Sequence, residues 1–531
     1  MKILKFFIAF YKSSDIIKKN GFLERGFFML KVLKREGLTR EEYALASFLQ
    51  GVVNRKHDMS ILIDVDIYLE YVNEPYVYVD LWTLVDEYIG EFKGMALYDL
   101  LPDDVGINLA ATVCAVEDYL GVPRALISKF DEKLPVLFDA ANYKGTNAQR
   151  QEQVFDLYKD KLNPQGLVHQ VVKGDDYHLE LRDFAICKGY YTFFTDEIEE
   201  DLAFRHKVLT WADRNIALYG WTTNEIAFLK NVSTYGNYVV PMDWSANHSY
   251  FSREISEGVA LNQKYTESEP LTPDKHYVAI VVSDGDNVQW LERDFATTST
   301  YGQRLRSNMN YKMNWTVSPS MASLCPLVMQ GLYDKAKNDY FITGVSGIGY
   351  TNLMTYPKEH LEAYAKLTAT SMQSSDLAYM CMLDNTAMLE DEQDVRERLD
   401  HFASYDNIKG AIWELDPNRY ESGKGRVLFS SNGKPFVSVR LSLWHPSNRM
   451  GNITKEWLDD YAEKINSFPV SPNTIDGYTV LNVHPWTVTI EDLDYLVSKL
   501  DSHVELVYVK DMLEAIEKKV EHKDVFPRII Y

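Results

Sequence analysis

Long apolar runs recur through the second half of the chain, and most are continuously apolar rather than alternating with polar residues. Such runs are typical of parallel strands that are buried on both faces of a sheet. Segments with helical periodicity, such as 357–373 and 454–465, separate most of them. The runs lie at residues 277–283, 312–318, 340–346, 377–383, 409–415, 435–444, 477–483 and 503–509.

Eight strands that alternate with helices predict an α/β fold, with a C-terminal (β/α)8-type barrel or a barrel-like parallel sheet. A doubly wound sheet shows the same alternation, so the closed and the open arrangement both remain alternatives. The connection at 416–434 carries several Gly and Ser residues and predicts a loop instead of a helix. We therefore expect one irregular unit.

The first half of the chain mixes both patterns and predicts one or two smaller α/β domains. Helices are expected at 38–55 and 107–121, and the polar, proline-containing segment 266–275 predicts a linker. Strands are expected at 59–65, 76–81, 94–99, 135–140 and 216–220. The predicted domains are an N-terminal α/β domain (1–135), a second α/β domain that closes over the barrel (136–270) and the barrel-like catalytic domain (271–531).

Composition and charge narrow the set of partners. Hydrophobic residues make up 46% and charged residues 25% of the chain, as in globular proteins. The net charge of −22, with no basic stripe to offset it, argues against nucleic acid and anionic membrane surfaces. Aromatic residues reach 13%, and their faces suit sugar rings as well as protein cores. The sequence does not indicate an oligomeric state.

Four cysteines without a CxxC motif predict buried free thiols in a reducing compartment. The apolar stretch at 3–10 hints at a signal peptide, but Lys5 interrupts it and no small-residue cleavage site follows. No later apolar run reaches the roughly 18 residues of a membrane span. We therefore expect a cytoplasmic protein, with secretion as the alternative.

The carboxyl ends of the predicted strands concentrate polar and aromatic side chains. In a barrel the reacting groups stand at these ends, so the set predicts an active-site rim that suits a carbohydrate. Asp and Asn also end strands because they cap the following helix, and any single member fits that role equally well. The expected catalytic carboxylates are Asp286 and Glu414, with Asp284 and Asp384 in reserve. The expected substrate-binding residues on the rim are Asn287, Tyr350, Trp444, His445, His484 and Trp486.

The run Asp284-Gly285-Asp286-Asn287 is the sharpest feature of that rim. Its glycine permits a tight turn, and repulsion between two close carboxylates would raise one pKa unless a cation bound both. His445 and His484 could add ligands, but they form no HxxxH or HExxH motif. We therefore expect no metal and no cofactor, while a divalent metal stays open as an alternative.

Two polar segments ahead of the linker could reach over the rim. They are 49–56 and 239–252, and in the second we expect Trp244 and Asn247 to contact substrate. Ordinary packing between domains explains both segments equally well.

The chain resembles the GxGYxYP family of putative glycoside hydrolases. The resemblance rests on residues 282–290, 318–350 and 482–486 and on the two polar N-terminal segments. In the family motif Gly-x-Gly-Tyr-x-Tyr-Pro, Gly347, Gly349 and Tyr350 match, but Tyr356-Pro357 follow only after a four-residue insertion.

This resemblance implies a bacterial-type hydrolase of carbohydrate metabolism and transfers no catalytic residue. The leading hypothesis is a glycoside hydrolase that cleaves a glycosidic bond with two carboxylates. A metal-dependent carbohydrate deacetylase or esterase, and a non-catalytic carbohydrate-binding protein, are the alternatives.

Overall fold

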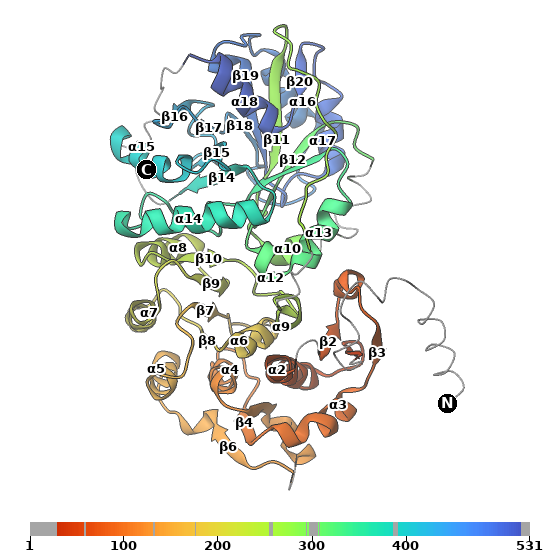
Figure 1. Cartoon of the computed structure of the whole chain (residues 1–531), viewed down its shortest axis with the longest axis vertical. Coiled ribbons are helices and arrows are strands. Elements are labelled where there is room, and N and C mark those ends of the chain that lie inside the picture. Colours follow the sequence, from red (N-terminus) through yellow and green to blue (C-terminus); the bar gives the residue numbers. More distant parts are fainter. Residues whose placement is uncertain are drawn as a thin grey trace, which may run out of the picture.

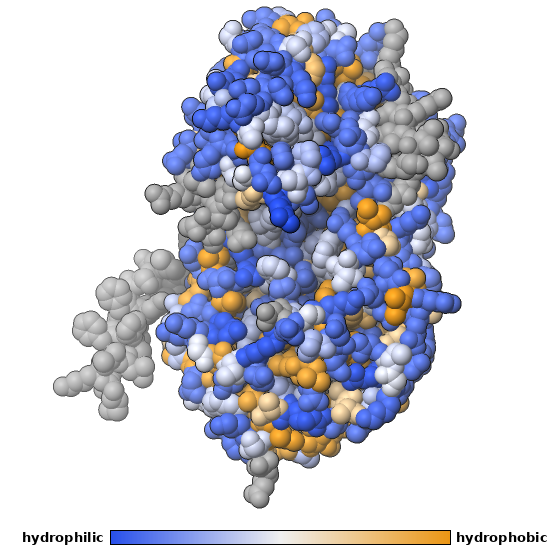
Figure 2. All heavy atoms as spheres, turned by 180° about the vertical axis from the view of Figure 1, so that it is seen from behind, coloured by the Kyte–Doolittle hydropathy of each residue, from blue (hydrophilic) through white to orange (hydrophobic). Residues whose placement is uncertain are grey.

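The computed structural model describes residues 29–57, 60–130, 133–175, 177–253, 259–293, 295–296, 306, 308–385 and 391–521. The apolar stretch at residues 3–10 lies outside them. In Figure 1 the N-terminal sheets occupy the lower part of the molecule and the C-terminal strands the upper part. Hydrophilic side chains cover most of the face in Figure 2, as expected for a net charge of −22. Within the described ranges, no helix is long and apolar enough to cross a membrane.

Two parallel three-stranded sheets form the N-terminal part, in the orders β2-β1-β3 and β5-β4-β6. The predicted helix at 107–121 ends early because β5 begins at Tyr119. The second sheet takes strands from both sides of the predicted boundary at residue 135, since β6 pairs with β4. The elements are β1 (Leu30–Lys34), α2 (Arg40–Lys56), β2 (Ile61–Asp64), η1 (Tyr68–Tyr71), β3 (Tyr76–Tyr78), α3 (Leu81–Tyr88), η2 (Ile89–Glu91), β4 (Gly94–Tyr98), α4 (Gly106–Val116), β5 (Tyr119–Pro123), η3 (Arg124–Lys129), β6 (Val136–Asp139), η4 (Ala140–Asn142) and α5 (Asn147–Tyr158).

A third, four-stranded parallel sheet follows, in the order β10-β9-β7-β8. It includes the strand predicted at 216–220. Its helix α8 begins at Glu225, because the Asn224 side chain accepts a hydrogen bond from the Ala227 amide and so caps the first turn. The elements are β7 (Gly166–His169), α6 (Arg182–Lys188), β8 (Tyr191–Phe193), α7 (Glu199–Trp211), β9 (Ala217–Gly220), α8 (Glu225–Thr234), β10 (Tyr238–Val240) and α9 (His248–Phe251).

The C-terminal part contains a strand for each of the eight predicted apolar runs, and the run at 435–444 is divided into β17 and β18. The elements are β11 (His276–Val282), α10 (Val288–Glu292), β12 (Met313–Val317), α12 (Met321–Leu324), α13 (Pro326–Asp334), β13 (Asp339–Thr343), α14 (Lys358–Ser374), β14 (Tyr379–Asp384), α15 (Glu392–Ala403), β15 (Gly410–Leu415), β16 (Val427–Phe429), β17 (Pro435–Ser438), β18 (Leu441–Leu443), α16 (Lys455–Asn466), η5 (Ile475–Gly477), β19 (Tyr478–Val483), α17 (Ile490–Val497), β20 (Val504–Leu506) and α18 (Val509–Lys519).

These strands form two mostly parallel sheets, β13-β12-β11-β19-β18 with β20 beside β11, and β14-β15-β17-β16. An α/β fold is confirmed, but the ladders do not form an eight-stranded (β/α)8 barrel. In such a barrel β20 would separate β19 from β11. Instead β19 pairs along one edge of β11, and β20 and β12 both pair with the opposite edge of β11. Buried Asn314 on β12 stabilises this order, because its Nδ2 donates to the carbonyls of Ile280 and Val507.

The two C-terminal sheets join at two places. Segment 435–443 pairs with β15 through β17 and with β19 through β18. On the other side, β13 and β14 are linked through side chains, since the amides of Cys381 and Leu383 donate to the hydroxyls of Thr343 and Ser346. The predicted irregular unit at 416–434 is confirmed, because it holds β16, which runs antiparallel to β17, and no helix.

The third sheet meets the carboxyl ends of the C-terminal strands. Val239 on β10 forms an antiparallel bridge with Tyr350, just after β13. The Val288 amide at the start of α10 donates to the Pro241 carbonyl, and Gln289 Nε2 donates to Asp243. The strand ends that the sequence predicts as a rim therefore face the third sheet.

Candidate active site

The Asp284–Asp286 loop follows β11 directly and is held against β12. The Gly285 amide donates to Thr316 Oγ1 at 2.8 Å, and that hydroxyl donates to the Val282 carbonyl at 2.8 Å. A Cβ on Gly285 would lie 1.8 Å from the Thr316 carbonyl oxygen, so no other residue fits without a shift of the backbone. The contact fixes where both flanking carboxylates stand.

Glu414 lies near the carboxyl end of β15 and is 1% exposed. Its Oε1 accepts a hydrogen bond from Asn482 Nδ2 on β19 at 2.8 Å, and Asn482 Oδ1 accepts from Ser442 on β18. Three strands thus hold this carboxyl group. Asp416 follows on the same strand end, and its pKa is raised by burial.

The carboxyl groups of these strand ends interact with one another. Burial raises the pKa of Asp286 well above its usual range, and the charge on Asp284 raises it further. Burial raises the pKa of Glu414 in the same way, and the charges of Asp284, Asp286 and Asp416 add to the shift. Asp286 and Glu414 are therefore suited to hold a proton at neutral pH beside a carboxylate.

The third sheet contributes a carboxyl group that the sequence reasoning missed, Glu225 in the first turn of α8. Its Oε1 accepts a hydrogen bond from the Tyr350 hydroxyl at 2.8 Å, and Asn385 donates to the same hydroxyl at 3.2 Å. Glu225 is exposed, and its pKa is raised by partial desolvation beside Tyr350 and by the charges on Asp284 and Asp416. Glu225, Asp284, Asp286, Glu414 and Asp416 are called the carboxylate cluster below.

Aromatic rings lie beside this cluster. Trp444 stacks on His484 with the ring centroids 4.0 Å apart and the planes 7° from parallel, and Tyr420 lies 5.0 Å from Trp444. His484 Nε2 is 3.8 Å from Asp284 Oδ2. Burial lowers the pKa of His484, although Asp284 opposes the shift. A flat wall with a neutral imidazole is suited to a sugar ring.

Asp384 and Asn287 belong to the strand ends but make other contacts. Asp384 is buried, and its Oδ1 accepts a hydrogen bond from Asn352 at 3.3 Å. Asn287 is the residue just before α10, and its side chain does not cap the helix. His445 lies 2.8 Å from the Ser447 hydroxyl, and Trp486, which is half-exposed, packs its ring on Trp290. The Asn287 amide donates to the Asp284 carbonyl and the Asp416 amide donates to the Asp384 carbonyl, so Asn287 and Asp384 border the carboxylate cluster through the backbone.

Trp244 and Asn247 lie in the packing between domains. The ring of exposed Trp244 lies 4.2 Å from that of His178. Asn247 is buried; its Oδ1 accepts hydrogen bonds from Gln50 and the Ile63 amide, and its Nδ2 donates to the Ile63 carbonyl. Asn247 thus ties the first sheet to α9, and its side chain has no free direction for a ligand.

The motif Gly347-Ile348-Gly349-Tyr350 serves both the packing of β10 and the carboxylate cluster. A Cβ on Gly349 would lie 2.4 Å from the ring of Tyr238, so the glycine lets β10 approach. Tyr350 then reaches Glu225. Tyr356, which follows the insertion, is buried and donates to the Gly236 carbonyl and to Asn215. Tyr356 therefore fastens the third sheet to the C-terminal part.

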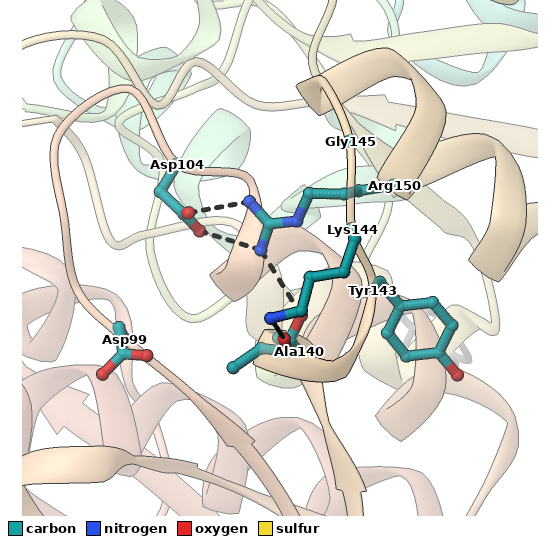
Figure 3. Close-up of a pocket in the computed structure, with 8 residues that line it drawn as sticks. Asp99, Asp104, Ala140, Tyr143, Lys144, Gly145 and Arg150 are labelled. Atoms are coloured by element: carbon teal, nitrogen blue, oxygen red, sulfur yellow. Dashed lines mark hydrogen bonds and ion pairs between the residues drawn. The ribbon is translucent and has the colours of Figure 1, made fainter.

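A separate polar pocket of about 280 Å³ lies at the carboxyl ends of β4 and β6 (Figure 3). Its charged groups are already paired: Arg150 with Asp104, and Asp99 with Arg124. Lys144 donates to the Ala141 carbonyl. We assign it no chemistry.

Comparisons with known proteins place these features in a family. Residues 274–516 match the model of the "GxGYxYP putative glycoside hydrolase C-terminal domain", and residues 167–253 match the "GxGYxYP third domain". The chain is also similar to a solved structure described as a "putative hydrolase" from Bacteroides thetaiotaomicron VPI-5482. The TM-score is 0.80 at 23% identity, over 93% of this chain and 96% of that one, which shows a shared fold. No curated protein matches the sequence. As the motifs predicted, the chain carries the third and the C-terminal domain of the GxGYxYP family.

Proposed function

We propose that the protein hydrolyses a glycosidic bond at the carboxylate cluster. The observation that supports this most strongly is the raised pKa of two buried carboxyl groups that lie beside a third. The pKa values of Asp286 and Glu414 are raised by burial and by the charge on Asp284. A glycosidase needs one protonated carboxyl group as general acid and one carboxylate as base or nucleophile.

Asp286 is our candidate for the general acid. It stands on the loop next to Asp284, whose charge keeps it protonated, and Glu225 adds to the same effect. Asp284 is our candidate for the carboxylate partner, because it contacts His484 beside the Trp444 ring. Glu414 is less exposed than Asp286 and is held by Asn482. Its role is either to set the charge of the carboxylate cluster or to donate the proton in place of Asp286.

The contribution of the third domain to the site supports the proposal, because this domain forms part of the wall around the carboxylate cluster. Glu225 and Tyr350 join the two domains through one hydrogen bond next to the catalytic candidates. A site closed by a second domain excludes water and strengthens the electrostatic interactions inside it. We therefore propose a composite site in which sugar stacks on Trp444 and faces Tyr350.

The experiment is turnover on a panel of glycans with four proteins: wild type, Asp286→Asn, Glu414→Gln and the control Asp213→Asn. Asp213 is exposed and lies in the turn between α7 and β9, before the amino end of β9, whereas Glu225 follows its carboxyl end. Asp286→Asn and Glu414→Gln should each lower kcat about 10²–10⁴-fold, the usual contribution of general acid–base catalysis. Asp213→Asn should match wild type.

Two other results would replace the proposal. Wild-type rates in both carboxylate variants would remove them from the mechanism. Glycan binding without turnover, weakened by Trp444→Ala, would indicate a carbohydrate-binding protein.

One contact favours a second candidate function, a metal-dependent carbohydrate deacetylase. Asp284 and His484 lie 3.8 Å apart, and an aspartate and a histidine are suitable ligands for a hydrolytic metal ion. The test is release of acetate from an acetylated glycan. Activity that is lost in both Asp284→Asn and His484→Gln, and that is absent from the wild type without metal, would favour this candidate over the glycosidase.

A further inference from the structure

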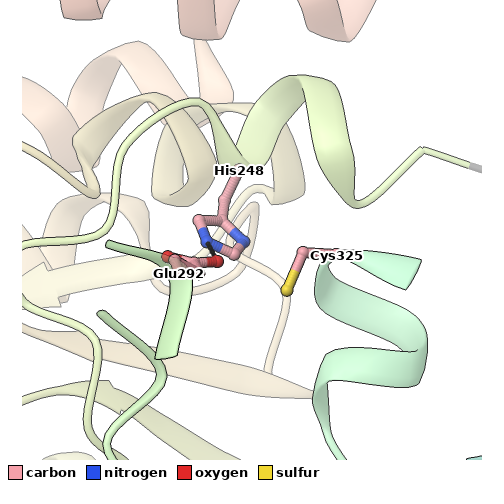
Figure 4. A group of neighbouring side chains, drawn as sticks. All are labelled: His248, Glu292 and Cys325. Atoms are coloured by element: carbon pink, nitrogen blue, oxygen red, sulfur yellow. Dashed lines mark ion pairs between the residues drawn. The ribbon is translucent and has the colours of Figure 1, made fainter. Parts of the chain in front are cut away.

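Three side chains with metal-binding atoms converge where the third domain meets the C-terminal domain (Figure 4). They are His248, the first residue of α9; Glu292, the last residue of α10; and Cys325, between α12 and α13. All three are buried, and one donor atom from each lies within 4.8 Å of the other two. The group is distinct from the carboxylate cluster and shares no residue with it.

The donor atoms of this group contact one another directly. His248 Nε2 forms an ion pair with Glu292 Oε1 at 2.7 Å, and the Cys325 thiol interacts with the same carboxylate. Glu292 Oε2, in contrast, accepts from the hydroxyls of Tyr68 at 2.9 Å and Ser245 at 2.8 Å. The Glu292 carboxylate therefore lies at the centre of the group, in contact with both the imidazole and the thiol.

A divalent cation can take the place of the proton shared in this ion pair. In Figure 4 the imidazole faces the Glu292 carboxylate along the ion pair, and the Cys325 side chain lies nearby. The hydroxyls on Oε2 fix the orientation of the carboxylate, as the outer contacts of metal ligands do. A divalent ion with one thiolate, one carboxylate and one neutral imidazole has no net charge, which suits a buried position.

We propose that His248, Glu292 and Cys325 bind a divalent transition-metal ion of the zinc class. The mixed nitrogen, oxygen and sulfur donors favour zinc over calcium or magnesium, which prefer oxygen. Zinc–ligand distances of about 2.0–2.3 Å separate tetrahedral donor atoms by about 3.3–3.8 Å, so His248 Nε2 and Glu292 Oε1 have to move apart by about 0.6 Å when the ion binds. Three protein ligands leave one position of a tetrahedral ion for a water molecule.

The ion joins two domains. His248 belongs to the third domain and the other two ligands to the C-terminal domain. Glu292 ends the helix that follows the Asp284–Asp286 loop, so the ion would anchor that loop from behind. The site shares no residue with the carboxylate cluster, so it does not depend on the proposed function.

The first test is the metal content of the full chain. Protein produced in zinc-containing medium should carry about one zinc per chain by elemental analysis, as expected for a single three-ligand site. Because a buried ion exchanges slowly, cobalt is introduced during production or refolding. The cobalt protein should show a thiolate-to-cobalt charge-transfer band.

Matched cysteine variants identify the ligand. Cys325→Ser should lose the charge-transfer band and the stoichiometric metal, whereas Cys114→Ser, at a buried thiol inside α4, should keep both. Substoichiometric metal in the wild type together with no cobalt band would overturn the proposal, and so would a band that persists in Cys325→Ser. The wild-type measurements decide the matter even if Cys325→Ser does not fold. Loss of glycan turnover without loss of metal would bear on the proposed function alone.

Discussion

Replacing Gly285 with alanine tests whether the contact between two strands positions the catalytic candidates. The added Cβ would lie 1.8 Å from the Thr316 carbonyl oxygen and 2.2 Å from its carbon, whereas real Cβ contacts essentially never fall under 3.0 Å. The obstacle is backbone in the centre of the sheet, so the loop has to move by about 1.2 Å or more.

This displacement has two expected costs. Forcing extra volume into a packed site costs about 1–3 kcal/mol of unfolding free energy. Losing the bond from the Gly285 amide to Thr316 adds about 1 kcal/mol. A shift of about 1 Å in a reacting group lowers the rate about 10²-fold, so the substrate found in the glycan panel should be turned over about that much more slowly.

Gly90→Ala is the matched control. Gly90 lies in the exposed helix η2, and a Cβ there would meet nothing within 4 Å. Both variants are unfolded in denaturant and followed by tryptophan fluorescence. Gly285→Ala should unfold at a lower denaturant concentration and Gly90→Ala at that of wild type or slightly above. Equal midpoints for Gly285→Ala and wild type would refute the reasoning, because the predicted clash would then have cost nothing.

Two further predictions concern pH. The pKa of Glu414 is raised by burial, so at neutral pH the unfolded chain loses a proton that the folded chain keeps, and the carboxyl group destabilises the fold. Glu414→Gln should therefore unfold at a higher temperature than wild type at pH 7. This difference in melting temperature should shrink as pH falls to about 4.3, the pKa of an unfolded glutamate. A difference that does not depend on pH would contradict the raised pKa of Glu414 in the folded chain. Burial lowers the pKa of His169 to about 3, while its Nε2 accepts from the Thr195 amide. Only the unfolded chain then binds the proton, so His169 should lower the unfolding free energy as pH falls below about 6.5, by about 1.4 kcal/mol per pH unit. In denaturant titrations at several pH values, the unfolding free energy of His169→Gln should fall with decreasing pH less steeply than that of wild type, by that amount per unit.

The strands of the C-terminal part were predictable because burial on both faces produces continuous apolar runs. Their order was not predictable in the same way. The positions of β19 and β20 around β11 depend on contacts between distant residues, such as those of Asn314 with Val507. A local pattern carries no such information, so the α/β fold was predictable, but the choice between a closed (β/α)8-type barrel and a barrel-like parallel sheet was not.

The candidate site shows the same division. Asp284, Asp286 and Glu414 were predictable because they end strands whose carboxyl ends meet. Glu225 was not, because an acidic residue in the first turn of a helix is explained by the helix dipole alone. Asn247 shows the opposite error: a polar residue in a polar segment suggested a ligand contact, but its hydrogen bonds go to Gln50 and the backbone of Ile63.

Both proposals depend on the same junction between domains. At one place in this junction the Tyr350 hydroxyl holds Glu225 beside the other carboxyl groups of the cluster. At a second place His248 pairs with Glu292. Between them, the segment 241–248 packs on α10, the helix that continues from the Asp284–Asp286 loop. The position of Asp286 is therefore set by β11 and β12 in front and by the third domain behind. A site assembled in this way has its catalytic groups on one domain and the contacts that hold them on another, which is why neither domain alone would be expected to reproduce its geometry.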